Sequence, residues 1–467
     1  MIVILGGGLA GLACSYHLGH EYCLILEKAP MPFGHIASET IDGFTWDKGP
    51  HVSFTKSEYV RDLFAKSVDQ RFDEYPVVVG NYYQGHWITH PAQTSLYQIP
   101  EPLRSECLSS FMATRNAEAP AAAPPANYME WLIQAFGPVF ARHFPAAYTR
   151  KYWTVEPADL TTAWLGDRVF YPKVSDVVQG TAGPLPHSNH YISSVRYPIS
   201  GGFQSFAAGM ARGAHLRLNS EVTGIDLAAK AVHLADGSSV TYERLINTLP
   251  LPSFIGLCRD VPLDVRNASD ELSCSQLLLV NVAARHSSRR PEHWMYVYDE
   301  SKLSTRINTT ERLTVGNAPS GRTGIQVEVY SSRHLPLKDE DKEVSRRVVQ
   351  ELTEMTLLDL FEPGSPQAPS VHTRRCDWAN IIFTHPTQPA MERIWRWMEN
   401  FGLHRESDDT GPLTQWDAKP EENFAGNSLF MAGRFAQWKY YWSDDCILRA
   451  KYLAESMRLQ AAPAVAR

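Results

Sequence analysis

The sequence predicts an α/β fold, mainly because its first 27 residues read as a strand–turn–helix–strand unit. Short apolar runs at residues 2–5 and 22–26 are typical of buried parallel strands. The turn between them contains three glycines in the spacing GxGxxG, namely Gly6, Gly8 and Gly11. Such glycines let backbone N–H groups approach a pyrophosphate at the start of the following helix. Because Glu27 ends the second strand, where an acid can accept hydrogen bonds from a ribose, the unit predicts a Rossmann-like dinucleotide site.

A group of β patterns in the middle of the chain indicates which dinucleotide is bound. Residues 216–222 alternate as a strand, residues 232–241 predict a hairpin around Asp236-Gly237, and residues 242–249 give a further strand. A β-rich insertion that returns to the first sheet is typical of FAD-binding folds and less so of NAD dehydrogenases. We therefore expect FAD.

The rest of the chain predicts two further parts. Its patterns are a Pro/Ala linker at 119–127, a helix at 128–140, several strand-like runs within 277–329, an amphipathic helix at 340–360, an apolar strand at 428–433 and a last helix at 445–459. We expect three discontinuous domains. They are an FAD-binding domain of residues 1–75, 190–260 and 420–467, a helical substrate or cap domain of residues 100–189, and an antiparallel sheet substrate domain of residues 76–99 and 261–419.

The composition is that of a globular protein. Hydrophobic residues make up 44% and charged residues 20% of the 467 residues, which excludes disorder as the main state. The 44 basic and 51 acidic residues leave a formal charge of −7, so we expect neither a nucleic acid nor an anionic membrane as partner. The 12 Trp, 20 Tyr and 19 Phe suit a site that stacks on flat rings.

The seven cysteines carry no ligand or disulfide pattern. They include no CxxC pair and no Cys/His spacing, so we expect no metal site and a reducing compartment. The apolar N-terminal run lacks a basic region and is interrupted by glycines, unlike a signal peptide. No window reaches the roughly 18 apolar residues of a membrane span. We expect a soluble, cytoplasmic protein.

Several tracts then resemble UDP-galactopyranose mutases of the eukaryotic type, which lie within the superfamily of FAD-dependent amine oxidases and protoporphyrinogen oxidases. Besides the glycine-rich turn, which all glutathione-reductase-type flavoproteins share, they are 44–51 (FTWDKGPH), 152–155 (YWTV), 164–169 (WLGDRV), 433–435 (GRF) and 438–440 (WKY). Weaker similarities lie at 87–91, 196–202 and 294–296, and all follow the family's order across nearly the whole chain.

The resemblance implies an isomerase of carbohydrate biosynthesis that interconverts the pyranose and furanose rings of a nucleotide sugar. In this family the flavin is active as FADH2: its N5 forms an adduct with the sugar, and no net oxidation occurs. The substrate is a nucleotide sugar, NAD(P)H is a possible source of the electrons, and a homo-oligomer is a possible assembly. The diphosphate needs cations, and arginine matches phosphate oxygens with its planar fork.

The family's functional positions can be carried over residue by residue. The catalytic positions fall on His51, which lies on a loop under the flavin, and on Arg168 and Arg306, which contact the diphosphate. The flavin positions beyond the first turn are Gly34, Gly49, Val222, Gly433, Arg434, Asp444 and Asp445. The substrate positions are His90, Phe144, Thr149, Trp153, Tyr296, Asn380 and Tyr440.

This sequence also departs from the family's pattern. Pro50 replaces a glycine beside the loop histidine, and proline fixes φ and lacks an N–H, which puts a redox-driven flip of this loop in doubt. His90, Thr149 and Asn380 replace a tyrosine, an asparagine and a tyrosine where the base, the sugar and the diphosphate are bound. A different nucleotide sugar, or a different reaction on one, is therefore open.

Two other functions remain open. The chain could be an oxidase or desaturase of the amine oxidase type that passes electrons to oxygen, or a catalytically silent flavin-binding partner of a biosynthetic complex. Oxygen consumption separates the oxidase from the mutase, and turnover of any kind excludes the silent partner.

Overall fold

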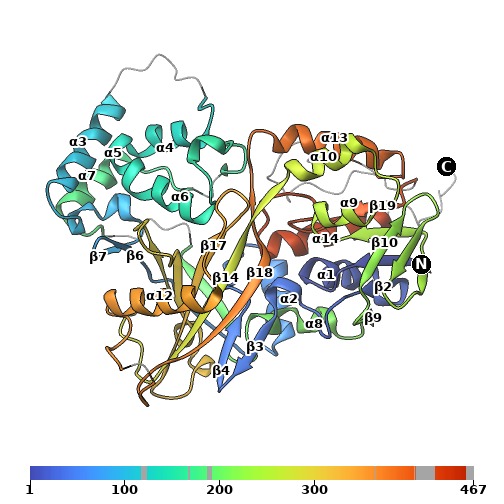
Figure 1. Cartoon of the computed structure of the whole chain (residues 1–467), viewed down its shortest axis with the longest axis horizontal. Coiled ribbons are helices and arrows are strands. Elements are labelled where there is room, and N and C mark those ends of the chain that lie inside the picture. The colour runs from blue at the N-terminus through green and yellow to red at the C-terminus, as the bar shows by residue number, and fades with distance from the viewer. Residues whose placement is uncertain are drawn as a thin grey trace.

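The computed structural model describes residues 1–116, 124–166, 169–186, 192–362, 364–403, 405 and 426–458 (Figure 1). A parallel sheet with helices α1 and α14, a long antiparallel sheet and a group of helices from α3 to α7 make up three regions of the molecule. The division of the chain into three domains stays a prediction. Among the described residues, no helix is long and apolar enough to cross a membrane.

The parallel sheet contains both strands of the glycine-rich unit. Its five strands, in spatial order, are β19 (Leu429–Met431), β13 (Arg244–Asn247), β1 (Ile2–Leu5), β2 (Cys23–Leu26) and β9 (Leu216–Arg217). Successive residues of β1 pack on opposite faces: Ile4 joins the cluster of α1 (Leu9–Leu18) and α14 (Ser443–Arg458), whereas Val3 and Leu5 join another. Burial on both faces explains why these strands are uniformly apolar.

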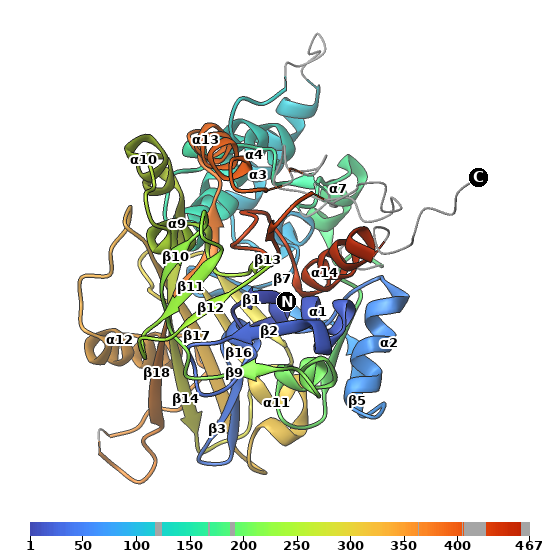
Figure 2. The ribbon, with the colours of Figure 1, turned by 90° about the vertical axis from the view of Figure 1, so that its right-hand side faces the viewer.

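A small antiparallel sheet covers the other face of the parallel sheet. Its strands are β10 (Val222–Asp226), β11 (Ala231–Leu234) and β12 (Ser239–Thr241). Figure 2 shows this sheet and the two helices α1 and α14 on opposite sides of β1 and β2. The predicted hairpin at 232–241 is confirmed, and Gly237 in its turn has φ +82°. The single strand predicted at 216–222 is wrong, because this segment contains the end of one sheet and the start of another.

A seven-stranded sheet forms the centre of the molecule. Its strands, in spatial order, are β18 (Ser370–Ile382), β14 (Ser273–Ala284), β17 (Thr323–Ser331), β16 (Arg306–Thr309), β15 (Trp294–Val297), β6 (Val79–Tyr83) and β7 (His86–Thr89). All neighbours are antiparallel except β15 and β6. Helix α12 (Asp341–Glu354) packs Val344 and Val348 against one face. On the opposite face the register aligns Tyr296, Arg306 and Glu328 on three neighbouring strands.

Short helices lie beside this sheet. They are α3 (Leu103–Asn116), α4 (Tyr128–Phe136), α5 (Pro138–Ala141), α6 (Ala147–Tyr152) and α7 (Val174–Ala182), with a π-helical turn over 142–146. The helix predicted at 128–140 is interrupted at Gly137, which has φ +75° and lies so close to α3 that an added Cβ would be 2.7 Å from the amide nitrogen of Phe111. The predicted linker at 119–127 and Leu459 of the predicted last helix lie partly or wholly outside the described residues.

The remaining helices and strands lie around these sheets. They are α2 (Glu58–Ser67), β3 (Ser38–Ile41), β4 (Phe44–Asp47), β5 (Phe72–Pro76), β8 (Ser194–Pro198), α8 (Ala208–Ala211), α9 (Leu251–Leu257), α10 (Leu263–Glu271), α11 (Thr310–Leu313) and α13 (Thr387–Glu399). The segment after β4 matters most for function, because it carries the predicted loop histidine, His51.

Candidate active site

One large cavity connects the glycine-rich turn with the helical region. Its volume is about 1200 Å³, above the roughly 300–1000 Å³ of most small-molecule sites, so it has room for a dinucleotide and a second ligand. The parallel sheet contributes Gly6 and Glu27, the seven-stranded sheet contributes Tyr296 and Arg306, and helix α6 contributes Thr149 to its lining.

The glycines at the dinucleotide end are required by their surroundings. Gly6 has φ +98°, and a Cβ there would lie 2.7 Å from Oγ1 of Thr248. A Cβ on Gly11 would lie 2.0 Å from the carbonyl oxygen of Gly6. Gly34 has φ +53°, and its Cβ would lie 3.0 Å from Cα of Gly8. The turn is therefore folded too tightly for side chains, and its backbone faces the cavity through Gly6 and Gly8.

Glu27 both shapes this turn and lines the cavity. Its carboxylate accepts hydrogen bonds from the amides of Gly7 at 2.7 Å and Ala29 at 2.8 Å. A carboxylate has about four acceptor positions, so two remain for a ligand. The first amides of helix α1 lie next to it and have no carbonyl partners within the helix. Together they provide an anion-binding helix end beside a hydroxyl-binding acid.

A second turn that lines the cavity, at Gly433, comes from the C-terminal part of the chain. Gly433 has φ +97°, and a Cβ there would lie 2.7 Å from Cβ of Ala10 in the first turn. The next residue, Arg434, donates from Nη2 to Oδ1 of Asn380 at 2.9 Å. Its Nε is buried and has no hydrogen-bonding partner among the described residues. Arg434 itself is one of the residues that line the cavity.

His51 lies on the loop after β4, and this loop approaches Glu328 of the seven-stranded sheet. Its Nδ1 lies 2.8 Å from the carbonyl oxygen of Gly49, which assigns the proton to Nδ1 and leaves a lone pair on Nε2. Burial lowers the pKa of His51 to about 4, so the ring is neutral at neutral pH. A Cβ on Gly49 would lie 3.6 Å from Oε1 of Glu328.

The base of this loop is fixed by Asp47. Its carboxylate accepts hydrogen bonds from Ser38 at 2.6 Å, Tyr197 at 2.8 Å and the amide of Phe203 at 3.1 Å. Burial raises the pKa of Asp47 to about 6. With three donors on one acid, the start of the loop is held in place on the side opposite the cavity.

Arg306 is paired with a buried carboxylate inside the cavity. Its Nε and Nη2 donate to the two oxygens of Glu328 at 2.6 and 2.7 Å, and Tyr330 donates to the same acid at 3.0 Å. Burial opposes the charge, but Glu328 raises the pKa of Arg306 well above its usual range. The side chain of Arg306 is 24% exposed while that of Glu328 is 2% exposed, so the arginine is the more accessible member of the pair, although both line the cavity.

Aromatic rings surround Arg306. The Tyr148 ring meets the Tyr296 ring edge to face with centroids 5.3 Å apart, and Tyr152 lies 4.8 Å from Tyr330. On the far wall, Trp153 lies 5.9 Å from Tyr440. Aromatic rings thus surround the Arg306–Glu328 pair at this end of the cavity, which we call the aromatic chamber.

The three residues that replace family positions also lie here. His90 contacts Oδ1 of Asn81 at 3.0 Å, and its ring lies 5.2 Å from that of Tyr296. Thr149 donates to the carbonyl oxygen of Pro145 at 2.7 Å. Asn380 accepts hydrogen bonds through Oδ1 from Tyr152 and from Arg434, and so links the chamber to the turn at Gly433.

The structure brings together most of the residues that the sequence singled out. Those that line the cavity are Gly6, Gly8, Glu27, Gly34, Gly49, His51, His90, Thr149, Trp153, Val222, Tyr296, Arg306, Asn380, Gly433, Arg434 and Tyr440. The others are placed differently. Phe144 is fully buried in the core, where it stacks on Phe140 with centroids 4.6 Å apart, and it does not line the cavity.

Three further predicted residues are not among those that line the cavity. Asp444 and Asp445 lie at the start of α14 and are not among the lining residues, although their neighbours Ser443 and Cys446 are. Asp445 accepts a hydrogen bond from the amide of Trp442 at 2.7 Å. Arg168 lies outside the described residues.

Sequence reasoning missed Glu328, Tyr330, Tyr148 and Tyr152, all of which line the cavity. A signal for the first two was present. In the strand 323–331 the polar or aromatic residues Gln326, Glu328 and Tyr330 alternate with apolar ones, which places all three on one face.

Comparison with known proteins supports the fold. The family model of flavin-containing amine oxidoreductases matches residues 9–400. A reduced UDP-galactopyranose mutase superposes with a TM-score of 0.84 at 20% identity, over 99% of this chain and 96% of that one. A protein of Exiguobacterium sp. 255-15 assigned as a protoporphyrinogen oxidase superposes with a TM-score of 0.70 at 15% identity, over 98% of each chain. The predicted fold class is therefore confirmed.

A curated relative matches a much smaller region. The zeta-carotene-forming phytoene desaturase of Myxococcus xanthus is 34% identical over 76 residues, which are 16% of this chain and 14% of the desaturase. This similarity is too short to say what the whole chain does.

Proposed function

The chain belongs to the family of flavin-containing amine oxidoreductases, and we propose that within it the protein is a flavin-dependent mutase that interconverts the pyranose and furanose rings of a nucleotide sugar. Family membership implies a flavin. That the flavin is FAD, that it acts in the reduced state and that the substrate is a nucleotide sugar are parts of the proposal.

The residues present fit FAD. The turn at Gly6 and Gly8 with the first amides of α1 suits the pyrophosphate, and Glu27 has acceptor positions left for the adenosine ribose. Arg434 lines the same cavity and adds a positive charge to it. The close contacts of Gly433 and Gly34 keep the space between the two turns clear of side chains.

When bound and reduced, the flavin would supply the nucleophile that attacks the anomeric carbon of the sugar. The protein must hold the nucleoside diphosphate while it is detached, stabilise its charge and keep it in place for return. These tasks are positioning and electrostatics, and both belong to side chains of this chain.

The observation that carries the proposal is Arg306 in its aromatic chamber. Its Nη1 makes no hydrogen bond with any described residue, and the side chain faces the cavity, so one edge of the fork is left for a phosphate oxygen. Arg306 and Arg434 are both positively charged and line the cavity together with the negatively charged Glu328. Arg168, outside the described residues, remains the predicted second diphosphate contact.

The same charges disfavour the alternative substrate of an amine oxidase. A protonated amine in the chamber would be repelled by Arg306 and Arg434, whereas Glu328, with a side chain that is 2% exposed, is already paired with Arg306. His51 adds no charge, because its low pKa keeps it neutral. It can accept a hydrogen bond at Nε2 from a sugar hydroxyl or from the flavin.

The deciding experiment is a product screen with the purified flavoprotein. Dithionite-reduced protein is incubated with a panel of nucleotide sugars, and the products are separated by chromatography and weighed by mass spectrometry. We expect a new product of identical mass from the reduced protein and none from the oxidised protein. Turnover by oxidised protein, with oxygen consumed in step with product, would instead assign an oxidase or a desaturase.

A further inference from the structure

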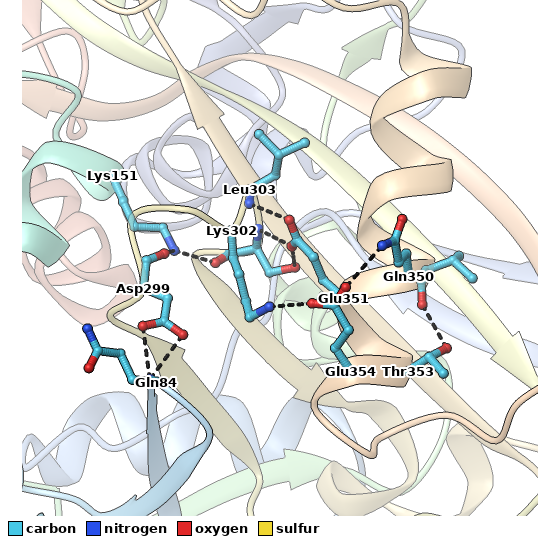
Figure 3. A network of polar contacts seen from close by, with 11 residues as sticks. Gln84, Lys151, Asp299, Lys302, Leu303, Gln350, Glu351, Thr353 and Glu354 are labelled. Carbon is cyan, nitrogen blue, oxygen red and sulfur yellow. Dashed lines mark hydrogen bonds and ion pairs between the residues drawn. The ribbon is translucent and has the colours of Figure 1, made fainter.

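The loop between β15 and β16 connects two residues of the proposed substrate site. Residues 298–305 form this loop, Tyr296 precedes it and Arg306 follows it, and the two side chains are paired across the strands. The position of the loop therefore sets the position of both residues. Figure 3 shows the polar contacts that hold it, which come from helix α6 on one side and helix α12 on the other.

Lys151 of α6 binds both ends of the loop. Its Nζ donates to the carbonyl oxygens of Val297 at 2.9 Å, Asp299 at 2.8 Å and Ser304 at 2.7 Å. An ammonium group has three N–H donors, and here each has one carbonyl acceptor. Val297 ends β15 and Ser304 lies two residues before β16, so a single side chain holds the two ends of the loop together.

The same helix lines the substrate chamber with its neighbouring residues. Tyr148 and Tyr152 of α6 face the cavity, and the Tyr148 ring meets that of Tyr296. Lys151 thus connects the helix that forms one wall with the hairpin that forms the next. The helix and the hairpin are about 145 residues apart in the chain, so they are not coupled through neighbouring residues of the backbone.

Other contacts hold the far side of the loop. Glu351 of α12 accepts hydrogen bonds from the amide of Leu303 at 2.7 Å and from the amide and hydroxyl of Ser304 at 2.9 and 2.6 Å. The carboxylate of Asp299 accepts from the amide of Gln84 at 2.9 and 3.1 Å. The loop is thereby held between two helices by contacts to its backbone.

We propose that Lys151 is a positioning residue for the substrate site: its ammonium group fixes the β15–β16 hairpin on helix α6 and so sets the distance from Tyr296 and Arg306 to the aromatic wall. The test of this proposal measures ligand binding and therefore rests on the proposed function. A shift of about 1 Å in Tyr296 or Arg306 can change rates about a hundredfold. Lys151 does not line the cavity and acts through these two residues.

The charge on Lys151 is finely balanced. Burial lowers its pKa to about 7, whereas Glu351 on α12 and Asp299 and Glu300 on the loop favour the charged form, and Lys302 opposes it. Arg150, beside it on α6, is bound to Glu300. A neutral amine has two N–H donors for three carbonyls, so the clamp weakens as pH rises through this pKa.

The test compares Lys151→Met with Lys302→Met in the full-length flavoprotein. Lys302 is on the same loop, but its ammonium binds the side chain of Glu354 at 2.7 Å and no backbone carbonyl of the described residues. Glu354 is 48% exposed, and ion pairs to exposed partners contribute little. Calorimetry with UDP as probe is run from pH 6.5 to 8.5. We expect Lys151→Met to raise the Kd about ten- to a hundredfold at pH 6.5 with unchanged flavin content, and Lys302→Met to change it less than about twofold.

The pH dependence separates positioning from general stabilisation. The wild-type Kd should rise with pH over this range, while that of Lys151→Met stays weak and level. An unchanged Kd in Lys151→Met, or a wild-type slope that persists in it, overturns the proposal. If Lys151→Met does not fold, Glu351→Gln loosens the same loop from α12 and should weaken UDP binding in the same direction; unchanged binding there counts against the proposal.

Hydrogen exchange distinguishes failure of this proposal from failure of the proposed function. The amide of Val297 donates to the carbonyl oxygen of Thr305 at 2.9 Å, and that of Thr305 to the carbonyl oxygen of Glu328 at 2.9 Å. Both should exchange faster in Lys151→Met than in Lys302→Met. If wild type binds no UDP, the proposed function fails, and equal exchange in the two variants would by itself exclude the clamp.

Discussion

Replacement of Arg306 by alanine tests the proposed diphosphate site most directly. The change removes one charged contact to a phosphate, which is worth roughly 1.5–3 kcal/mol, or about ten- to a hundredfold in Kd. It also uncovers Glu328, which in the wild type is screened by two hydrogen bonds from the arginine. A carboxylate at roughly 5 Å from a phosphate costs about 3 kcal/mol at an effective dielectric constant of about 20. We therefore expect Arg306→Ala to weaken UDP binding by more than about a hundredfold.

The double variant Arg306→Ala/Glu328→Gln separates the two contributions. Without the carboxylate the repulsion is absent, so the Kd should return to about ten- to a hundredfold above that of wild type. Arg306→Lys should restore little of the UDP affinity. The lysine ammonium is a point charge and lacks the planar fork with which arginine can bind Glu328 and a phosphate at the same time. Binding is measured by calorimetry, and flavin absorbance serves as the control for folding, since neither residue belongs to the dinucleotide end.

Two results would refute this reasoning. If Arg306→Ala binds UDP as well as wild type does, the arginine is not a diphosphate contact. If the double variant binds no better than the single one, the extra loss in Arg306→Ala does not come from repulsion by Glu328.

Three further predictions address the flavin and its loop. Glu27→Ala should weaken FAD by about ten- to a hundredfold, measured by fluorescence titration of the apoprotein, while Glu21→Ala on the surface serves as control. Burial holds the pKa of His51 near 4, below the usual 6.5, so stability present above about pH 6.5 is lost as pH falls toward 4, by up to about 3 kcal/mol. Denaturant unfolding from pH 4 to 8 should show a smaller loss in His51→Gln. Because Pro50 restricts its neighbours, crystal structures of the oxidised and reduced protein should show one conformation at Gly49 and His51; a flip between them would contradict this role of Pro50.

Sequence reasoning succeeded where the determinants are local. The strand at residues 2–5 and the helix after the glycine-rich turn lie where the apolar pattern and the glycine spacing predict them. Gly11 of this turn is required by a contact within the unit, because an added Cβ would meet the Gly6 carbonyl oxygen. By contrast, residues 216–222 show an uninterrupted β pattern although two sheets share them, because alternation does not say which neighbour a strand pairs with.

The charge state of the substrate site could not be read from the sequence for the same reason. Arg306 and Glu328 are 22 residues apart, and their pairing depends on the register between β16 and β17. A shift of one residue would turn Glu328 to the face covered by α12, where the apolar Val327 now lies. The resemblance to known mutases supplies the arginine but not its partner. Under the proposed function, the strength with which Arg306 holds a phosphate therefore depends on a partner from a neighbouring strand. The hairpin that carries Arg306 is held in turn by Lys151 of α6, which no sequence pattern singled out.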